Sequence, residues 1–256
     1  MMATGMNSHF DFNNKSFVIA GAGGIGTAIA RKIDDCGGRI VLVDLNEETL
    51  KRAAQTLVST PLCCSCDFSY VSDIENVVQY IVAENGPIDG LVYCAGIGDS
   101  RPVKLSNYDF MKRVMDINFF SYIEFVRQFT RRGNYNEGLC FVGISSVGAF
   151  LGNPAQTAYA ASKAAMNGAI RCIAKELAPK GIRINNIAPG TTNTEMFRKA
   201  ASAHGQEQGF TSRLERQYLG LCEPDDIANA AVFLLSDMSR MITGSCLGVD
   251  GGKLTS

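Results

Sequence analysis

The sequence predicts an α/β protein with a mostly parallel sheet, and three observations support this. Short apolar runs of strand length alternate with longer helical patterns, which is typical of βαβ units. The first apolar run, Ser16–Ala20, leads directly into a glycine-rich segment at 21–26 and then into a helical pattern. A later run rich in helix formers carries Tyr159 and Lys163 at helical spacing.

Composition narrows the class of protein. The chain has 256 residues, of which 46% are hydrophobic and 19% charged, which is ordinary for a globular enzyme. Its net charge of −1 and the absence of a basic run argue against nucleic acid or an anionic membrane as partner. No apolar stretch reaches membrane-spanning length, and no linker or repeat is visible. We therefore expect a polar arm at 1–15 and one domain at 16–256.

The cysteines and histidines exclude some chemistry. Nine cysteines, an odd number with irregular spacing, suggest free thiols in a reducing cytoplasm. The cluster Cys63, Cys64 and Cys66 lacks a second ligand pair, so we expect small apolar fillers of a buried strand and no metal site. The only histidines, His9 and His204, leave little room for a Ser-His hydrolase.

Strands are predicted at 16–20, 39–43, 62–66, 88–94, 139–145, 182–188 and 245–249. After the first helix, which follows the glycines, helices are predicted at 47–58, 71–84, 101–132, from Tyr159 to about 180, and at 223–235. Residues 191–217 are less regular, with short helices expected at 195–203 and 211–218. Long excursions at the carboxyl edge of a sheet are often substrate loops, which is our expectation here.

The first functional motif is Gly21-x-Gly23-x-x-Gly26 between a strand and a helix. This is the context of a dinucleotide-binding turn, where glycines let the backbone approach a pyrophosphate at the helix N-terminus. Asp44 ends the second strand, where a carboxylate can bind ribose hydroxyls and repel the 2′-phosphate of NADP, which favours NAD. Alternatively, Asp44 caps the helix at 47–58. Asp67, after the third strand, is placed to meet the adenine amino group.

The second motif is Tyr159-x-x-x-Lys163, preceded by Ser146 at the end of the fifth strand. Positions i and i+4 share one helix face, so phenol and ammonium can share a site. The cation would lower the pKa of the phenol, which then exchanges protons with an alcohol or ketone, while Ser146 holds the same oxygen. The alternative is a buried tyrosine and a solvated lysine on an ordinary amphipathic helix. Asn118, within a helical pattern, says little by itself.

Taken together, the motifs from about Lys15 to Gly252 resemble those of the short-chain dehydrogenase/reductase family. The matching residues are the glycine turn, Asp67, Ala95-Gly96, Asn118, Ser146, Tyr159, Lys163, Pro189-Gly190, Thr194-x-Met196 and Val249-Asp250-Gly251-Gly252. The resemblance implies a single-domain Rossmann-type doubly wound sheet of about seven strands with helices on both faces. It also implies a homo-oligomer, a tetramer or a dimer.

The resemblance assigns roles to individual residues. Tyr159 would be the general acid/base, Ser146 would orient the substrate oxygen, Lys163 would bind the nicotinamide ribose, and Asn118 would hold a water in a proton relay. Thr194 would touch the carboxamide end of the cofactor. The implied cofactor-binding set is Gly21, Gly23, Gly24, Ile25, Gly26, Asp44, Leu45, Cys66, Asp67, Phe68, Cys94, Ala95, Gly96, Tyr159, Lys163, Pro189, Gly190, Thr192 and Thr194.

Two departures from the family pattern stand out. An ungapped alignment puts Ala20 at the family's first glycine, so the turn follows the older dinucleotide spacing, and we expect phosphate binding with an altered turn. The second departure is Tyr93-Cys94, where the family usually has Asn-Asn. The missing asparagine normally braces neighbouring strands, so that task must fall to the backbone or to another residue.

The sequence predicts an NAD(H)-dependent oxidoreductase that interconverts a secondary alcohol and a ketone. The alternatives are an NADPH-dependent 3-oxoacyl reductase of fatty-acid synthesis and a non-catalytic dinucleotide-binding protein. The substrate pocket is expected to draw on Ala95–Arg101, Val147–Gln156 and the 191–217 loop. Its apolar members favour a hydrophobic hydroxy compound such as a hydroxysteroid; they are Phe150, Leu151, Met196, Phe197 and Phe210.

Overall fold

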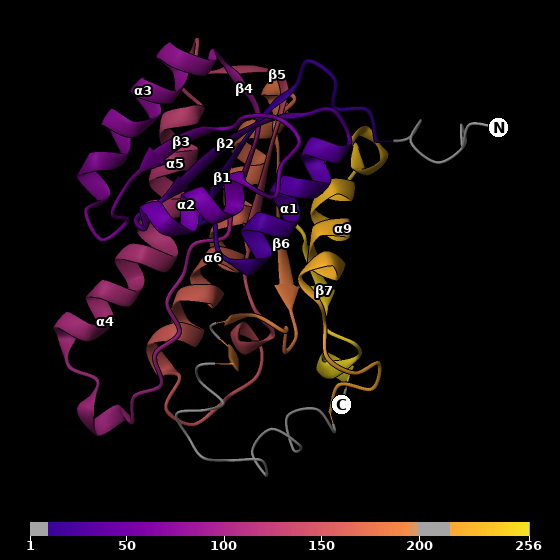
Figure 1. Ribbon diagram of the computed structural model, residues 1–256. Coiled ribbons are helices and arrows are strands. Elements are labelled where there is room, and N and C mark those ends of the chain that lie inside the picture. Colours follow the sequence, from indigo (N-terminus) through magenta and orange to yellow (C-terminus); the bar gives the residue numbers. More distant parts are fainter. Residues whose placement is uncertain (1–9, 196, 199–215, 256) are drawn as a thin grey trace.

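A computed structural model describes residues 10–195, 197–198 and 216–255, and its centre is one parallel sheet (Figure 1). The seven strands lie in the order β3-β2-β1-β4-β5-β6-β7, and every neighbouring pair is parallel. Their bounds are β1 Ser16–Ala20, β2 Arg39–Asp44, β3 Leu62–Ser65, β4 Ile88–Tyr93, β5 Tyr135–Ile144, β6 Arg183–Pro189 and β7 Cys246–Val249. The predicted α/β class with a parallel sheet is confirmed.

Helices cover both faces of the sheet, as expected for a doubly wound fold (Figure 1). They are α1 Gly24–Asp35, α2 Glu47–Ala54, α3 Ile74–Asn85, α4 Tyr108–Met115, α5 Ser121–Phe129, α6 Thr157–Leu177 and α9 Pro224–Leu235. The buried side chains of α1, α2 and α9 form one apolar core with the sheet, and those of α3, α5 and α6 form the other. Because both faces are covered, the central strands β1 and β4 are buried along almost their whole length and are mostly apolar.

The strand order reverses between β1 and β4, and this places the ligand crevice. In open α/β sheets, ligands bind beyond the carboxyl ends of the strands at such a switch point. Ala20 pairs with Val43 on one side and with Tyr93 on the other, and Tyr93 pairs with Gly143. The segments after these strands therefore meet at one edge.

The segment before β1 differs from the expected loose arm. Residues 1–9 lie outside the described part of the chain. Phe12 is fully buried, and its ring centroid lies 4.7 Å from that of Phe17. The Phe12 N–H also donates to the carbonyl of Cys36 at 3.0 Å. The polar neighbours of Phe12 concealed a core residue, so Phe10–Lys15 is part of the packed fold.

The predicted helix at 101–132 is divided. A single 3-10 turn at Val103–Leu105 precedes α4, whose N-terminus is capped by Asn107, and a π-turn at Asp116–Phe120 separates α4 from α5. Smaller differences are an earlier end of α2 at Ala54 and an earlier start of β5 at Tyr135. The helices expected at 195–203 and 211–218 lie largely outside the described residues.

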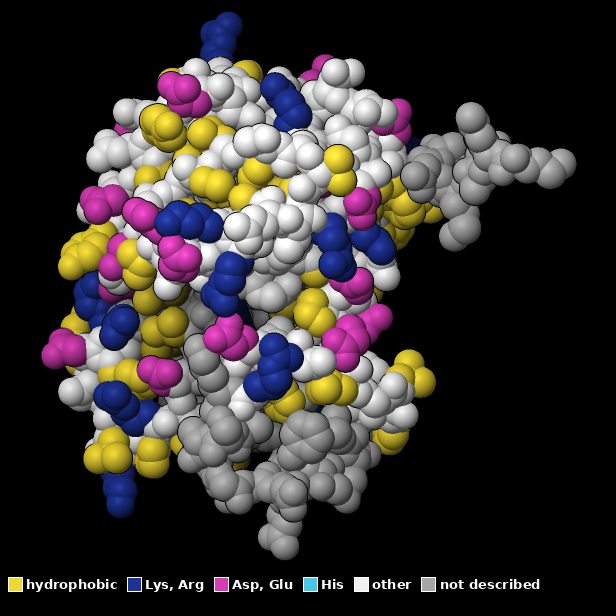
Figure 2. Space-filling model, viewed as in Figure 1, with side chains coloured by type: hydrophobic (Ala, Val, Ile, Leu, Met, Phe, Trp, Pro, Cys, Tyr) yellow, Lys and Arg dark blue, Asp and Glu magenta, His cyan; other side chains and the backbone are white. Residues whose placement is uncertain are grey.

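All nine cysteines fall in described positions and are unpaired. Cys64 and Cys66 are buried as predicted. Cys63 is exposed, so the prediction that it fills a buried strand is wrong. In the described segments no group of His, Cys, Asp or Glu could hold a metal ion, and no helix is long and apolar enough to cross a membrane. On the face shown in Figure 2, acidic and basic side chains are interspersed.

Candidate active site

Ser146 and Tyr159 meet beyond the carboxyl end of β5. Ser146 follows that strand, its Oγ accepts the Gly148 N–H at 3.0 Å, and hydrogen bonding from its side chain lowers the pKa of the Tyr159 phenol. Tyr159 lies in the first turn of α6, whose buried face packs on the sheet. A Cβ at Gly148 would lie 3.3 Å from Ser146 Oγ and 3.5 Å from the Tyr159 ring, so the absence of a side chain there lets the two groups approach. Ser146 and Tyr159 thus lie close together on either side of Gly148.

Lys163, one turn along α6, is almost fully buried behind this pair. Its Nζ donates to the carbonyl oxygen of Ile144 at 2.7 Å and lies 5.9 Å from the centroid of the Tyr159 ring. Burial disfavours the charged form and lowers the pKa of Lys163 to about 8. A solvated surface lysine, the alternative considered for the sequence, is therefore wrong.

The pKa of Tyr159 differs from the expectation. Burial of the phenol raises its pKa above the ordinary value, and the hydrogen bond from Ser146 only partly opposes this effect. Lys163 donates to a backbone carbonyl instead of to the phenol, and burial is the largest cause of the shift in the pKa of Tyr159. In the protein alone, the predicted lowering by Lys163 is thus wrong, because desolvation outweighs the distant cation.

Asn118 is fully buried in the π-turn, and its side chain is held on both sides. Its Oδ1 accepts the Ile97 N–H at 2.9 Å, and its Nδ2 donates to the Ile97 carbonyl at 3.0 Å and to Ser162 Oγ at 2.9 Å. A Cβ at Gly96 would lie 3.3 Å from both Asn118 Oδ1 and Lys163 Nζ, so Gly96 sits between the two side chains. The structure brings Asn118 to the same site as Tyr159 and Lys163.

Two of the three motif glycines shape the turn, and the third lines open space. Gly21 has a φ of +97°, and a Cβ there would lie 2.5 Å from the Ala95 nitrogen. A Cβ at Gly26 would lie 1.9 Å from the Gly21 carbonyl oxygen. At Gly23, by contrast, no described atom would come within 4 Å. Gly24 and Ile25 open α1, which carries no side-chain cap and no acid in its first turn in the described structure.

These features fit a dinucleotide. Open space lies beside Gly23 at an uncapped helix N-terminus, where backbone N–H groups and the helix dipole favour a phosphate. The altered glycine spacing therefore leaves a turn of the kind that accepts a pyrophosphate.

Asp44 connects this turn to β2. Its Oδ2 accepts the Ala22 N–H at 2.8 Å, and its Oδ1 accepts the Asn46 N–H at 3.0 Å. The cap of α2 is Asn46, which accepts the Thr49 N–H, so the alternative role of Asp44 as the helix cap is wrong. Leu45, beside it, is 58% exposed and offers an apolar surface next to the turn.

The other cofactor-binding candidates near the end of β3 are Asp67, whose side chain makes hydrogen bonds, and Cys66 and Phe68, whose side chains are buried. Asp67 Oδ1 accepts hydrogen bonds from the N–H and the hydroxyl of Ser69, at 2.8 and 2.7 Å, which fixes the turn after β3. Cys66 and Phe68 are buried, and the Phe68 ring packs against Tyr93 and Phe125 in the core. Only the backbone of Cys66 and Phe68 therefore remains for a cofactor.

The segment after β4 lies against the glycine turn. The N–H groups of Cys94 and Ala95 both donate to the Ala20 carbonyl, at 2.7 and 2.9 Å. Burial raises the pKa of the Cys94 thiol to about 12, with Lys163 close enough to oppose the shift. The thiol is therefore protonated at neutral pH and is not a nucleophile.

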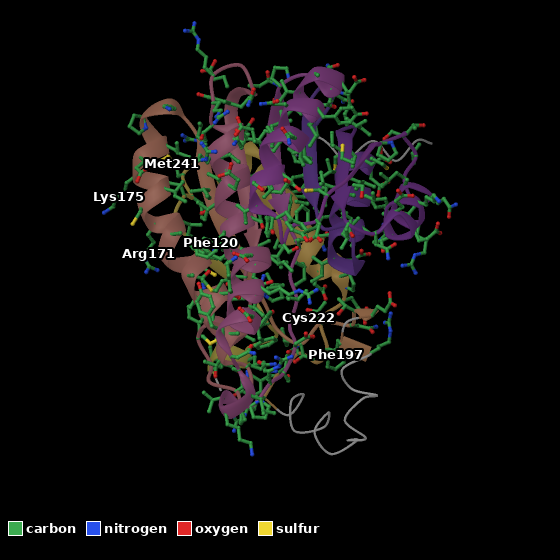
Figure 3. The ribbon with its side chains drawn as sticks, turned by 90° about the vertical axis from the view of Figure 1, so that its left-hand side faces the viewer. Phe120, Arg171, Lys175, Phe197, Cys222 and Met241 are labelled. Carbon is green, nitrogen blue, oxygen red and sulfur yellow. The ribbon has the colours of Figure 1, made fainter. Side chains whose placement is uncertain are left out.

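The loop after β6 folds over the helix end. The Thr194 methyl carbon lies 3.7 Å from the position of a Cβ on Gly24, which brings the predicted carboxamide-side threonine to the phosphate turn. Pro189 ends β6, and the Thr192 hydroxyl donates to the Gly190 carbonyl at 3.1 Å. Phe197 and Cys222 lie at this same end of the molecule in Figure 3.

Gln217 organises this loop, and sequence reasoning missed it. It is buried, its Oε1 accepts the Thr191 N–H at 2.8 Å, and its Nε2 donates to the carbonyls of Thr191 at 3.1 Å and Gly220 at 2.6 Å. A glutamine in an irregular polar segment gives no sequence signal for such a role.

With this geometry in view, comparisons with known proteins define the class. Residues 19–253 match the family model described as Enoyl-(Acyl carrier protein) reductase. The chain is 34% identical over 246 residues to the 3-oxoacyl-(acyl-carrier-protein) reductase FabG of Rickettsia bellii, covering 95% of this chain and 98% of that protein. It is 32% identical over 244 residues to the 7alpha-hydroxysteroid dehydrogenase of Escherichia coli K12, covering 94% of each.

Solved structures of dehydrogenases and reductases have the same fold as this chain. A dehydrogenase/reductase from Sinorhizobium meliloti superposes with a TM-score of 0.89 at 28% identity, over 97% of this chain and 98% of that one. A short-chain dehydrogenase/reductase from Brucella melitensis, titled glucose/ribitol dehydrogenase, gives 0.87 at 30% identity, over 95% and 98%. The chain is an oxidoreductase acting on CH–OH groups. It belongs to the short-chain dehydrogenase/reductase family, whose members use NAD(P)(H).

Proposed function

We propose that this protein is an NAD(H)-dependent oxidoreductase that interconverts a secondary alcohol and a ketone. The observation that carries the proposal is the meeting of Tyr159 and Ser146 with buried Lys163 and Asn118 at the carboxyl edge of the sheet. A tyrosine is a useful proton donor or acceptor to a substrate oxygen when a second hydroxyl fixes that oxygen.

In the proposed mechanism each residue has one task. Ser146 holds the substrate oxygen within reach of the Tyr159 hydroxyl, which accepts the proton in oxidation and donates it in reduction. Lys163 binds the nicotinamide ribose, and Asn118 holds a water in a proton path. When bound, the nicotinamide supplies or accepts the hydride. The non-catalytic alternative is set aside because the family is enzymatic.

Asp44 supports NAD(H) over NADP(H). Its carboxylate is fixed at the end of β2 by two backbone N–H groups, beside the turn that would hold the pyrophosphate. A fixed negative charge there favours ribose hydroxyls and repels a 2′-phosphate.

For the substrate we propose a hydrophobic hydroxy compound. Phe150, 55% exposed, follows the Ser146 segment, and Phe197 follows Thr194. Met196 and Phe210 lie outside the described residues. The similarity to a 7alpha-hydroxysteroid dehydrogenase supports a bulky alicyclic substrate.

A second candidate is a 3-oxoacyl reductase that uses NADPH. The family-model description and the Rickettsia relatives favour it, since both concern carrier-protein-linked substrates. Asp44 is the residue that argues against it. The two candidates therefore differ in the cofactor as well as the substrate.

The first experiment titrates the purified protein with NADH and NADPH and then screens secondary alcohols and a 3-oxoacyl thioester. A preference for NADH of about tenfold, or 1.4 kcal/mol, supports the first candidate. A preference for NADPH with turnover of the thioester supports the second. Tyr159→Phe should abolish turnover while it retains NADH binding, and unchanged turnover would contradict the catalytic assignment.

We also propose that the enzyme works in the cytoplasm as a homo-oligomer. Its unpaired cysteines suit a reducing compartment. Phe120 and Met241, which are 45% and 82% exposed, lie on the left-hand side of the view in Figure 3 near Arg171 and Lys175, and a second copy would cover this apolar surface. Light scattering of the full chain tests the assembly state.

A further inference from the structure

Tyr93 is connected to the π-turn that carries Asn118 through the backbone carbonyl of Ile117. Tyr93 is the last residue of β4, it is fully buried, and its hydroxyl donates a hydrogen bond to the Ile117 carbonyl. Ile117 immediately precedes Asn118 within the π-turn. The bond therefore ties the end of the central strand to the backbone beside Asn118.

The π-turn departs from regular α-helical geometry. At its end the Ser121 N–H donates to the carbonyl of Asp116, five residues back rather than four, which widens the helix. The Ser121 hydroxyl reinforces the same carbonyl at 2.6 Å. A hydrogen bond of this kind contributes about 0.5 to 1.5 kcal/mol. The Tyr93 hydroxyl donates to the Ile117 carbonyl inside the widened turn and so ties this turn to the end of β4.

We propose that Tyr93 is a positioning residue that holds the π-turn in the form that presents Asn118 to the active site. Its bond runs from the end of β4 to the π-turn, while the backbone N–H groups of Cys94 and Ala95 hold the neighbouring strand through the Ala20 carbonyl. The effect on turnover rests on the proposed role of Asn118, whereas the effect on the turn itself does not. Strand β4, the turn and the Asn118–Ile97 hydrogen bonds form one connected unit.

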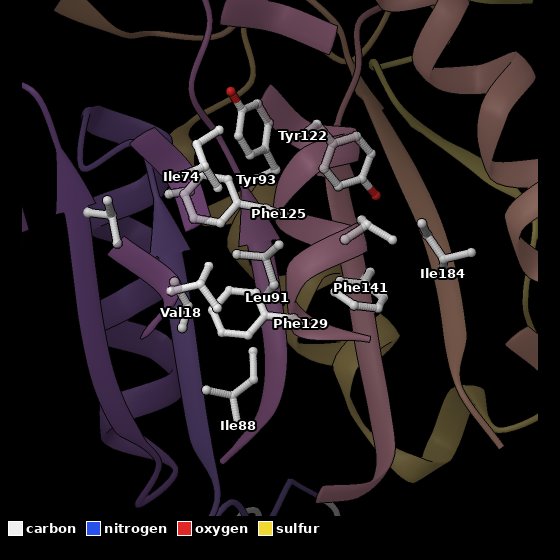
Figure 4. Close-up of a cluster of buried hydrophobic side chains, with 14 of the residues drawn as sticks. Val18, Ile74, Ile88, Leu91, Tyr93, Tyr122, Phe125, Phe129, Phe141 and Ile184 are labelled. Carbon is white, nitrogen blue, oxygen red and sulfur yellow. The ribbon is translucent and has the colours of Figure 1, made fainter. Parts of the chain in front are cut away.

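Tyr122 is the matched control. It is also fully buried, and its ring centroid lies 5.2 Å from that of Tyr93 in the same aromatic cluster. Figure 4 shows the two hydroxyls directed away from each other. Within the described chain the Tyr122 hydroxyl has no hydrogen-bond partner. Replacing it with Phe therefore makes the same chemical change in the same core without removing a known bond.

The experiment compares Tyr93→Phe with Tyr122→Phe by amide hydrogen exchange of the full protein. Tyr93→Phe should speed the exchange of the Ile97 N–H, which donates to Asn118, by about tenfold, and Tyr122→Phe should leave it within about twofold. Exchange at Ile97 that is unchanged in Tyr93→Phe, or equally faster in both variants, would overturn the proposal. Hydrogen exchange at Ile97 does not require turnover, so a failure of this proposal can be distinguished from a failure of the proposed function.

A double-mutant cycle on kcat adds a functional readout once a substrate is in hand. Tyr93→Phe should lower kcat by about tenfold in the wild type and have little further effect in Asn118→Ala, because both changes remove the same contribution. Equal and additive losses in both backgrounds would show that Tyr93 acts only through general stability, and would contradict the proposal.

Discussion

The carboxylate of Asp44 and the backbone N–H of Ala22 lie 2.8 Å apart and form a hydrogen bond. One side chain thus holds the backbone of the glycine turn and, in the proposed function, also carries the charge that selects NAD(H). The proposal therefore predicts that cofactor selection and the geometry of the turn are coupled.

Replacing Asp44 should affect both properties. We expect Asp44→Ala to weaken NADH binding at least about tenfold and to narrow the difference between NADH and NADPH, because the repulsive charge is removed. The loss of an acceptor for two backbone N–H groups should also lower the free energy of unfolding, by about 1 to 3 kcal/mol. Fluorescence titration and urea unfolding measure the two effects. Asp35→Ala, an acid at the last residue of α1, is the control.

Gly23→Ala and Gly26→Ala should behave differently. A methyl group at Gly23 meets no described atom within 4 Å, so the protein should fold normally but lose dinucleotide affinity, since the methyl enters the proposed phosphate space. At Gly26 the methyl would meet the Gly21 carbonyl, so thermal stability should fall as well. Melting curves with and without NADH separate the two outcomes. Full NADH affinity in Gly23→Ala would contradict the phosphate site.

The raised pKa of Tyr159 predicts how the rates depend on pH. Alcohol oxidation needs the deprotonated phenol, so its rate should rise with pH, while ketone reduction should fall. Because the Ser146 hydrogen bond lowers the pKa of Tyr159, Ser146→Ala should shift both profiles toward higher pH. Profiles of kcat/KM against pH test this, and an unshifted midpoint in Ser146→Ala would contradict the coupling.

Lys163 should make stability depend on pH. Its folded pKa is about 8 against an ordinary value of 10.5, so between these values the unfolded chain binds the extra proton. Stability should therefore rise with pH in this window, by about 2 kcal/mol from pH 7 to 9.5. Comparing urea unfolding of the wild type with that of Lys163→Met isolates the contribution of Lys163 to the pH dependence of stability, because the other titratable groups are common to both proteins. An equal pH dependence in the two proteins would show that Lys163 is not desolvated.

Gln217→Glu should loosen the loop after β6. A carboxylate can accept the Thr191 N–H but cannot donate to the carbonyls of Thr191 and Gly220, which it would then face with a negative charge. We expect a loss of stability on the order of 2 kcal/mol and weaker cofactor binding. Exposed Gln55→Glu provides the control.

The sequence alone identified the class of protein and nominated most of the candidate site. Periodicity and glycine placement are local properties, so the alternation of strands and helices, the phosphate turn and the Tyr159–Lys163 spacing could be read directly. Asp44 and Ser146 were found because strand ends of a parallel sheet share one edge. The placement of Asn118 beside Lys163 came only from the resemblance to a known family.

Tertiary packing determined the pKa of Tyr159 and the long-range contacts that the sequence did not reveal. The pKa of Tyr159 moves opposite to the sequence expectation because desolvation depends on everything that covers the phenol, and not on its neighbour four residues away. Phe12, Gln217 and Tyr93 act through partners distant in the chain, which no local pattern encodes. The sequence by itself determined which chemical groups are present and on which elements they lie. Only the folded structure decided which of them are desolvated and which backbone groups they hold, because both depend on long-range contacts.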